Sequence, residues 1–382
     1  MKILIFRTNG DIINITNYNS QEIGLAKSLV DAGHICDIVF FNGKNPSKIE
    51  EVRYGGNTIK IYWEHGFSIA GNGIFPKANR LFSEYDVIQL SEYDQLTSIY
   101  YMYFSSFKGK TILYHGPYYS DFKKKYNMKC RVVDCIPVSK KLKAQIPCAA
   151  KSFLAKKFLI QKGYKNITVT GVGLDTEKFD KRAPIEEETQ SIINSISDSH
   201  IMLYIGQIEP RRNIKFLIHV VDKISKSNAR CKLLMVGKGK NHQYVEECHS
   251  LIIELNLEKR IIWIDSMIQS QLPYLYEKAA VFLLPSNYEI FGMVMMEAMY
   301  FGLSVITTPN GGSTTVISNE EDGFIEELNL DKWTSLIERI LNDNSLATRV
   351  GNAARQKIID KFTWSSVAKK MIEVYRKVVV TK

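Results

Sequence analysis

Short apolar runs alternate along this chain with amphipathic stretches of helical length. In the carboxy-terminal half the runs are continuous, as expected of strands that are buried on both faces. The runs lie at 201–206, 231–237, 260–265, 279–285 and 303–308, and the helical stretches at 213–226, 241–256 and 291–301. Alternation of this kind predicts βαβ units and a parallel sheet.

The amino-terminal half is organised in the same way. We predict a helix over 20–34, with Ser20 as its N-cap and Gly33 as its C-terminal stop. Strands are expected at 2–7, 35–41, 86–90, 111–115, 135–139 and 166–171, with a basic amphipathic helix near 149–162. The two halves together predict an α/β chain of two tandem doubly wound, Rossmann-like domains.

The stretch 175–200 differs from both halves, because it is charged, contains Pro184 and has no apolar period. A chain of 382 residues is also long enough for two domains. We therefore predict a first domain over 1–180, a linker over 181–200, a second domain over 201–362, and a helix over 363–382 that crosses back to the first domain. Ligands of such sheets bind beyond the carboxyl ends of the strands, so we expect an interdomain cleft.

The net charge of +10 comes entirely from the first half of the chain. Residues 1–182 hold 27 Lys and Arg against 16 Asp and Glu, whereas the remainder holds 23 against 24. Within 108–165 the balance is 15 basic against 2 acidic residues, and the lysines are interleaved with aromatic and apolar residues. This segment fits an anionic membrane surface, and equally fits a merely solvated basic face. Nucleic acid fits the charge but no other feature, and we expect none.

Location is predicted from the start of the chain and its cysteines. The first apolar run is only Ile3 to Phe6 and Arg7 follows it, which does not fit a signal peptide. No run approaches the roughly 20 apolar residues of a membrane span. The six cysteines form no CxxC pair, which favours free thiols in a reducing compartment. We expect a cytoplasmic protein, either free or peripheral on the inner face of the cell membrane.

Two carboxylates stand eight residues apart in "SNYEIFGMVMMEAM" (286–299), a segment otherwise suited to a core. The pattern predicts a strand, a loop that carries Glu289, and a helix that begins near Gly292. Amide groups in the first turn of a helix lack intrahelical acceptors and suit a diphosphate. Carboxylates on either side suit sugar and ribose hydroxyls. In the alternative, Glu289 caps the helix and Glu297 is a solvated helix residue.

This segment resembles the E-x7-E signature of the retaining glycosyltransferases of family 4, which have the GT-B fold. Other segments resemble the family in the same order, namely "LAKSLVDAGHICDIV", "VSKK", "GVGLDTEKF", "PNGGSTTVI" and "EDGFI". The resemblance covers nearly the whole chain and is weakest at 44–80. Residues 16 and 17, Thr16 and Asn17, stand where many relatives have a Gly-Gly pair.

The resemblance implies a role for each site residue. Glu289 would contact hydroxyls of the transferred sugar, and Glu297 would hold the ribose. "GQIEPRRNIKFL" resembles the phosphate-binding segment of the family. The residues expected to contact the donor, several of them through backbone groups, are Gly206, Gln207, Arg211, Gly239, Met267, Ile290, Phe291, Gly292, Met293 and Glu297.

A cation is needed beside the leaving diphosphate. A helix terminus is worth about 0.3–2 kcal/mol, whereas enzymes lower barriers by about 8–23 kcal/mol. Arg212 matches a family position of Lys or Arg and is expected to be catalytic. Gln207 replaces a second family arginine, so either Arg211 supplies that charge or the diphosphate relies more on the helix. His115 resembles the family histidine that faces the donor sugar, and is otherwise a histidine satisfied at a strand end.

These features predict a retaining transferase that moves a sugar from a nucleotide-diphosphate donor to a hydroxyl of a saccharide acceptor. The acceptor is expected to be lipid-linked, in cell-surface polysaccharide synthesis. UDP is favoured over GDP on commonness alone, and no metal or cofactor is expected because the chain has no convincing DxD pair. Two alternatives stay open: a nucleotide-sugar epimerase of the same fold, and a degenerate GT-B subunit that only binds.

Overall fold

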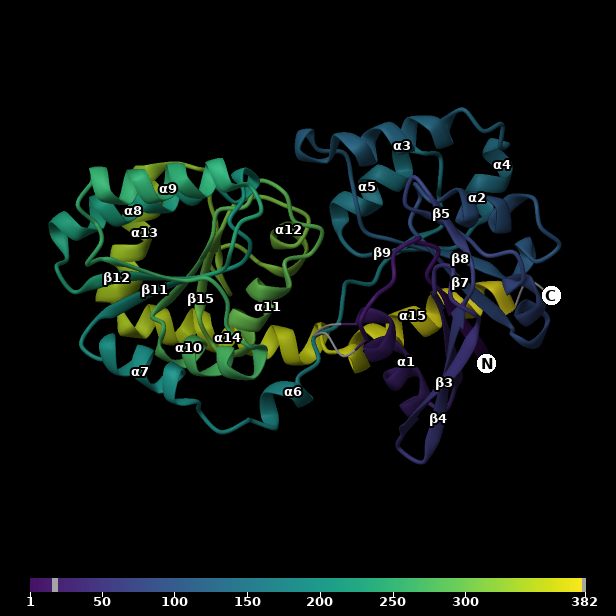
Figure 1. The fold of residues 1–382 in the computed structure, drawn as a ribbon, viewed down its shortest axis with the longest axis horizontal. Helices are drawn as coiled ribbons and strands as arrows, with labels where there is room; N and C mark the ends of the chain where they lie inside the picture. Colours follow the sequence, from purple (N-terminus) through teal and green to yellow (C-terminus); the bar gives the residue numbers. More distant parts are fainter. Residues whose placement is uncertain (16–19, 380–382) are drawn as a thin grey trace. The chain divides into compact units, whose positions relative to one another are not determined.

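The computed structural model describes residues 1–15 and 20–379, which form two compact units (Figure 1). The first unit comprises Met1–Gly173 with Phe362–Lys382, and the second comprises Leu174–Lys361. The range 181–200, where we expected a linker, instead contains helix α7 (Glu187–Ser195), which contacts α10 (Leu272–Lys278) within the second unit. Only Thr189 and Ile193 of α7 are buried, so the sequence shows no apolar period there.

The second unit is built on a six-stranded sheet in the order β13-β12-β11-β14-β15-β16, and every neighbouring pair is parallel. The strands are β11 (His200–Ile205), β12 (Cys231–Val236), β13 (Ile261–Ile264), β14 (Val281–Leu284), β15 (Ser304–Thr307) and β16 (Phe324–Ile325). The order reverses between β11 and β14, so the crevice at the carboxyl ends of these two strands is where a doubly wound sheet binds its ligand.

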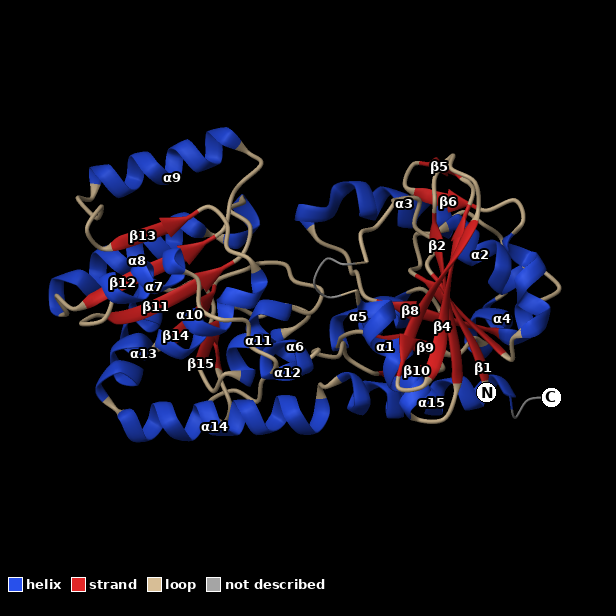
Figure 2. Ribbon diagram, turned by 60° about the horizontal axis from the view of Figure 1, so that its bottom comes forward, coloured by secondary structure: helices blue, strands red, loops and turns tan. Residues whose placement is uncertain are grey.

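Helices cover both faces of this sheet (Figure 2). Besides α7 and α10, the helices of this unit are α6 (Glu177–Asp180), α8 (Ile214–Ser227), α9 (His242–Glu254), α11 (Met293–Tyr300), α12 (Ser313–Val316), α13 (Leu330–Asn342) and α14 (Asn344–Lys361), together with the 3-10 turns η4 (Pro210–Arg212) and η5 (Gln269–Gln271). Apolar side chains repeat on the inner face of α8, where Leu217, Val220, Val221 and Ile224 are buried.

The first unit contains an eight-stranded sheet in the order β10-β9-β8-β7-β1-β2-β4-β3, parallel except for the β3–β4 pair. Its strands are β1 (Lys2–Phe6), β2 (Ile35–Phe41), β3 (Lys48–Tyr54), β4 (Asn57–Glu64), β7 (Val87–Ser91), β8 (Thr111–His115), β9 (Cys148–Ala150) and β10 (Ile167–Val169), beside a small hairpin of β5 (Phe67–Ile69) and β6 (Asn72–Ile74). The strand expected at 135–139 is wrong, since this Pro-containing stretch is an irregular loop. The strand in its place, β9, was missed because it has only three residues.

The helices of the first unit are α1 (Gln21–Asp31), α2 (Leu96–Tyr103), α3 (Lys124–Asp134), α4 (Lys140–Gln145), α5 (Phe153–Gln161) and α15 (Trp364–Val379), with the turns η1 (Ala78–Glu84), η2 (Lys108–Lys110) and η3 (Asp121–Lys123). Ser20 precedes α1, but its side chain makes no capping bond. Gly33 follows the helix with φ +79°, as a C-terminal stop requires.

Helix α15 packs on α1 through Trp364. A Cβ on Gly24 would lie 2.2 Å from Nε1 of this ring, and a Cβ on Gly173 would lie 2.4 Å from Cδ2. The last helix therefore depends on two positions that only glycine can occupy.

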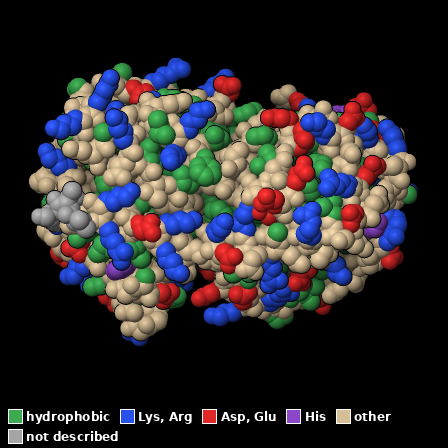
Figure 3. Space-filling view, turned by 180° about the vertical axis from the view of Figure 1, so that it is seen from behind, with side chains coloured by type: hydrophobic (Ala, Val, Ile, Leu, Met, Phe, Trp, Pro, Cys, Tyr) green, Lys and Arg blue, Asp and Glu red, His purple; other side chains and the backbone are tan. Residues whose placement is uncertain are grey.

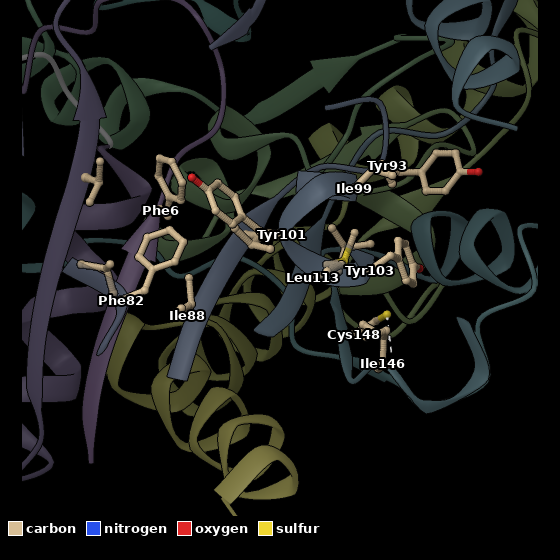
Figure 4. Close-up of a cluster of buried hydrophobic side chains, with 14 of the residues drawn as sticks. Phe6, Phe82, Ile88, Tyr93, Ile99, Tyr101, Tyr103, Leu113, Ile146 and Cys148 are labelled. Carbon is tan, nitrogen blue, oxygen red and sulfur yellow. Dashed lines mark hydrogen bonds between the residues drawn. The ribbon is translucent and has the colours of Figure 1, made fainter. Parts of the chain in front are cut away.

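The core of the first unit is rich in aromatic side chains (Figure 4). Phe6 and Phe82 meet edge to face with ring centroids 5.5 Å apart, and Tyr101 packs on Phe82 at 4.7 Å. The hydroxyl of Tyr103 donates to that of Tyr164 at 2.7 Å, so these buried phenols partner each other. These ring contacts and this hydrogen bond pack the core beneath the sheet of the first unit.

Candidate functional site

The loops that follow β11 and β14 are tied together at the reversal point of the second unit's sheet. The amide of Asn287 donates to the carbonyl of Arg211 at 2.9 Å. The side chain of Asn213, in a left-handed conformation with φ +53°, donates from Nδ2 to the carbonyl of Pro285 at 2.6 Å. Turn η4 is therefore held directly against the loop that carries Glu289.

Glu289 lies at the centre of a buried ionic cluster. Its Oε1 contacts Nη1 of Arg212, and Nη1 of Arg211 lies 3.2 Å from the same oxygen. Arg212 also donates to the hydroxyl of Ser286 at 3.2 Å, and Arg211 donates to the carbonyl of Tyr288 at 2.5 Å. Residues 211, 212 and 289, which we expected at one site, are thus in direct contact.

Two carboxylates balance the two arginines in this cluster. Nη2 of Arg211 lies 2.5 Å from Oε1 of Glu209, and Nε of Arg212 lies 3.9 Å from the same oxygen. The Nε–H groups of both arginines are buried and donate to no acceptor in the part of the chain that the structure describes. Buried donors without acceptors are rare, so an anion with several oxygens fits this position.

Helix α11 begins beside this cluster. Gly292 precedes it with φ +77°, a conformation that favours glycine, and its carbonyl accepts from the amide of Met295 at 3.1 Å. A Cβ on Gly312 would lie 1.7 Å from the carbonyl oxygen of Phe291, so the loop after β15 packs tightly against this one. The flanking Ile290 and Met293 are half-buried. A Cβ on Gly292 would lie 3.8 Å from Cγ of Glu289, so the start of α11 is close to the carboxylate that contacts Arg212.

Glu297 lies on α11 and is almost fully buried, which excludes the solvated helix residue of the alternative interpretation. Its Oε2 accepts from the hydroxyl of Tyr276 at 2.8 Å. The Tyr276 ring is itself held by stacking on Phe301 at 5.2 Å. A buried carboxylate held by a donor suits a position where hydroxyls are recognised.

The remaining donor-binding candidates lie on loops after β11, β12 and β13, at the same edge of the sheet. Gly206 has its amide bonded to the carbonyl of Val236 at 2.9 Å, while the Gln207 side chain is exposed. A Cβ on Gly239 would lie 2.5 Å from the carbonyl oxygen of Ile208. Met267 is half-buried. At these positions the loops offer backbone groups, and no charged side chains, to a ligand.

His115, in the first unit, ends β8 and is fully buried. Its ring stacks on Phe158 with centroids 5.0 Å apart. Nδ1 lies 3.0 Å from Oε2 of Glu92 and 3.2 Å from the amide nitrogen of Tyr93, and Nε2 has no hydrogen-bond partner among the described residues. A cavity of about 320 Å³ lies in the same unit. Glu92 and Lys151 line this cavity, whereas His115 does not.

Glu92 is a carboxylate of the first unit that several neighbouring groups contact. It adopts φ +57°, which is unusual for a side chain of this size, and accepts from Lys151 at 3.1 Å and from the amide of Gly116 at 2.9 Å. Burial alone would raise the pKa of Glu92, but the Lys151 charge, His115 and Gly116 outweigh it and lower the pKa to about 2. Glu92 is therefore ionised and a weak base.

Sequence reasoning missed Glu92, Glu209 and Tyr276, since no motif marks a residue that acts by holding another. Thr16 and Asn17 lie outside the described residues. Over the described ranges, no three His, Cys, Asp or Glu side chains gather as a metal site would require. No helix within those ranges combines the length and the apolar character that a membrane crossing needs.

Comparison with known proteins matches residues 186–357, just under half of the chain, to the family "Glycosyl transferases group 1". An uncharacterized glycosyltransferase of Methanocaldococcus jannaschii is 28% identical over 207 residues, or 53% of this chain and 52% of the relative. A capsular polysaccharide biosynthesis glycosyltransferase of Staphylococcus aureus, CapM, is 28% identical over 248 residues, or 63% and 61%. The chain thus spans about half to three fifths of the length of these relatives.

Solved structures extend the likeness in fold to the whole chain. Sucrose-phosphate synthase of Thermosynechococcus elongatus superimposes with a TM-score of 0.74 at 19% identity, covering 100% of both chains. Anabaena HepE in complex with UDP superimposes with a TM-score of 0.71 at 16% identity, covering 98% of this chain and 99% of HepE. The chain therefore has the α/β GT-B fold, and its residues 186–357 match the group 1 family of glycosyl transferases.

Proposed function

We propose that this chain is a retaining glycosyltransferase that moves a sugar from a nucleotide diphosphate, UDP before GDP, to a hydroxyl of a saccharide acceptor. The observation that carries the proposal is the contact of Glu289 with Arg211 and Arg212 beside the first turn of α11. Cations and a helix start suit a leaving diphosphate, and a carboxylate next to them suits the hydroxyls of the sugar that departs.

The residues divide the chemistry between them. Arg212, with Arg211, stabilises the negative charge that develops on the diphosphate as the glycosidic bond breaks. Glu289 orients the sugar through its hydroxyls. Glu297 accepts from the ribose. In this scheme the acceptor hydroxyl attacks on the leaving group's face, a donor phosphate oxygen takes its proton, and no covalent glycosyl-enzyme forms. No metal or cofactor takes part.

The acceptor is proposed to be a lipid-linked saccharide. One relative, 25% identical over 217 residues, is named UDP-Gal:alpha-D-GlcNAc-diphosphoundecaprenol alpha-1,3-galactosyltransferase, of Escherichia coli. CapM is named for capsular polysaccharide biosynthesis. The basic segment 108–165 supports the same proposal, because an enzyme that acts on a lipid-linked acceptor works at an anionic membrane surface.

The test is a thermal-shift panel of nucleotide diphosphates and their sugars, followed by transfer assays with the donor that stabilises the chain. Binding should raise the melting temperature by mass action. Donor consumption that depends on an acceptor saccharide supports a transferase. Consumption at the same rate without any acceptor favours the epimerase, and binding without consumption favours the degenerate subunit.

A further inference from the structure

Glu209 belongs to the arginine cluster of the second unit, but the roles given to the other members leave it without one. Its backbone is fixed on both sides. The amide of Ile208 donates to the carbonyl of Lys238 at 3.1 Å, and the carbonyl of Glu209 accepts from the amide of Arg212 at 2.9 Å. Pro210 follows Glu209 and restricts the chain further. Movement at Glu209 is therefore confined to its side chain.

The ion pair of Glu209 differs from the ordinary surface pairs of this protein. Acidic and basic side chains lie next to one another over much of the face drawn in Figure 3, and exposed pairs of this kind contribute little to stability. Oε1 of Glu209 lies 2.5 Å from Nη2 of Arg211 and 3.9 Å from Nε of Arg212, and these arginine side chains are only 15% and 11% exposed. The carboxylate of Glu209 therefore acts on two cations that are largely shielded from water.

Glu209 is also the most exposed charged side chain of the cluster. Its side chain is 32% exposed, compared with 10% for Glu289. Oε1 of Glu209 accepts no hydrogen bond from the residues that the structure describes, whereas Oε1 of Glu289 accepts one from Nη1 of Arg211 at 3.2 Å. Charge alone thus holds Oε1 of Glu209 against the arginines. The side chain of Glu209 can turn out into water, where its charge is solvated.

The charges of the cluster explain why such a movement is needed. Two arginines face two carboxylates, so the protein's own charges cancel. A diphosphate brings several further negative charges and matches the Nε–H groups of both arginines, which donate to no acceptor among the described residues. One carboxylate must then move away, because like charges repel. Glu289 is assigned to the sugar, which leaves Glu209.

We propose that Glu209 is a positioning residue that acts through Arg211. It holds the guanidinium of Arg211 until the nucleotide binds, and turns out into solvent when the diphosphate takes its place. This inference rests on the proposed function, because it requires a diphosphate at Arg211 and Arg212. A carboxylate that competes with the diphosphate weakens nucleotide binding and thereby helps the UDP product to leave after transfer.

The experiment is calorimetric titration of the full chain with UDP, UMP and uridine, which differ only in the number of phosphate groups. Glu209→Gln removes the charge and keeps the size of the side chain. It should bind UDP on the order of 10-fold more tightly than the wild type, UMP with a smaller gain, and uridine equally. Glu258→Gln, which removes an exposed carboxylate just before β13 and so at the opposite edge of the sheet, is the matched control and should bind all three as the wild type does.

Two further variants test whether the effect is electrostatic and passes through Arg211. Glu209→Asp keeps the charge and should bind UDP within about threefold of the wild type. In an Arg211→Ala background, the gain from Glu209→Gln should shrink to less than about threefold, because the cation that the carboxylate neutralises is missing. A purely structural role of Glu209 would instead weaken binding of all three ligands.

The outcomes separate this inference from the proposed function. If the wild type binds UDP no more tightly than uridine, the arginines do not hold a diphosphate and both proposals fail. If the wild type prefers UDP but Glu209→Gln binds it equally or more weakly, only the role of Glu209 is overturned. A gain for uridine as large as that for UDP, an equal gain in Glu209→Asp, or an undiminished gain without Arg211 would overturn it as well.

Discussion

Arg212 and Glu289 form an ion pair in which both side chains are about nine-tenths buried. Any diphosphate that binds to Arg212 must compete with this carboxylate, which also contacts Arg211. In the proposed reaction, however, Glu289 is needed to hold the sugar. The same residue should therefore oppose nucleotide binding and support transfer.

Replacement of Glu289 by Gln should separate these two effects. UDP should bind several-fold more tightly, because a negative charge beside the diphosphate is removed. Transfer should fall on the order of 100-fold, because hydrogen bonds to a charged group are worth about 1.5–3 kcal/mol. Isothermal titration with UDP and initial transfer rates measure the two effects, with Glu258→Gln as an exposed control. Weaker UDP binding together with unchanged transfer would contradict the assignment.

Tyr276 is expected to position Glu297 for the ribose. Its hydroxyl donates to Oε2 of Glu297, and Tyr276→Phe removes only that donor. We expect the wild type to prefer UDP over 2′-deoxy-UDP, and the preference to shrink toward equal affinity in the variant. Tyr274→Phe, which removes a 2.8 Å bond to the carbonyl of Ala183, is the matched control for loss of a hydrogen bond. An unchanged preference would show that Tyr276 serves stability alone.

Stability in acid should depend on Glu92. Its pKa is lowered to about 2 in the folded state, so its contribution is present above the unfolded pKa near 4.5 and is lost as the pH falls through 2. That contribution is at most about 3 kcal/mol. Glu92→Gln should therefore be less stable than the wild type at pH 7 and lose less stability between about pH 5 and pH 3. Urea unfolding over this range measures the difference, and parallel losses would contradict the lowered pKa.

Gly24 should tolerate no side chain. A Cβ there would lie 2.2 Å from Nε1 of Trp364, so Gly24→Ala must displace α15 or α1. Overpacking of this kind costs about 1–3 kcal/mol. Gly109→Ala, where a Cβ meets nothing within 4 Å, is the control. Thermal unfolding of both variants measures the effect, and equal melting temperatures would mean that the Trp364 contact is loose.

The fold class was predictable because its strands are continuous apolar runs, as in β11 and β14, and their alternation with helices indicates parallel sheets. The short strand β9 has too few residues to give such a signal, and the hairpin of β3 and β4 was not predicted although alternating residues on either side of Gly55 and Gly56 are typical of one. Contact of Glu289 with Arg212 also could not be read from sequence, since 77 positions separate them and only the sheet brings their loops together. The surroundings of His115 could not be predicted from a motif, because the residues next to it in the sequence indicate neither that it is buried nor that Glu92 is its partner.

The central claim is that the start of α11 and Arg212 together hold the diphosphate of the donor. The most direct measurement is calorimetric titration of wild type and Arg212→Ala with UDP and with uridine, which lacks the diphosphate. Affinity for UDP should fall by about 10- to 100-fold in the variant while affinity for uridine stays the same. Equal UDP affinity in the two proteins, or an equal loss for UDP and uridine, would contradict the claim.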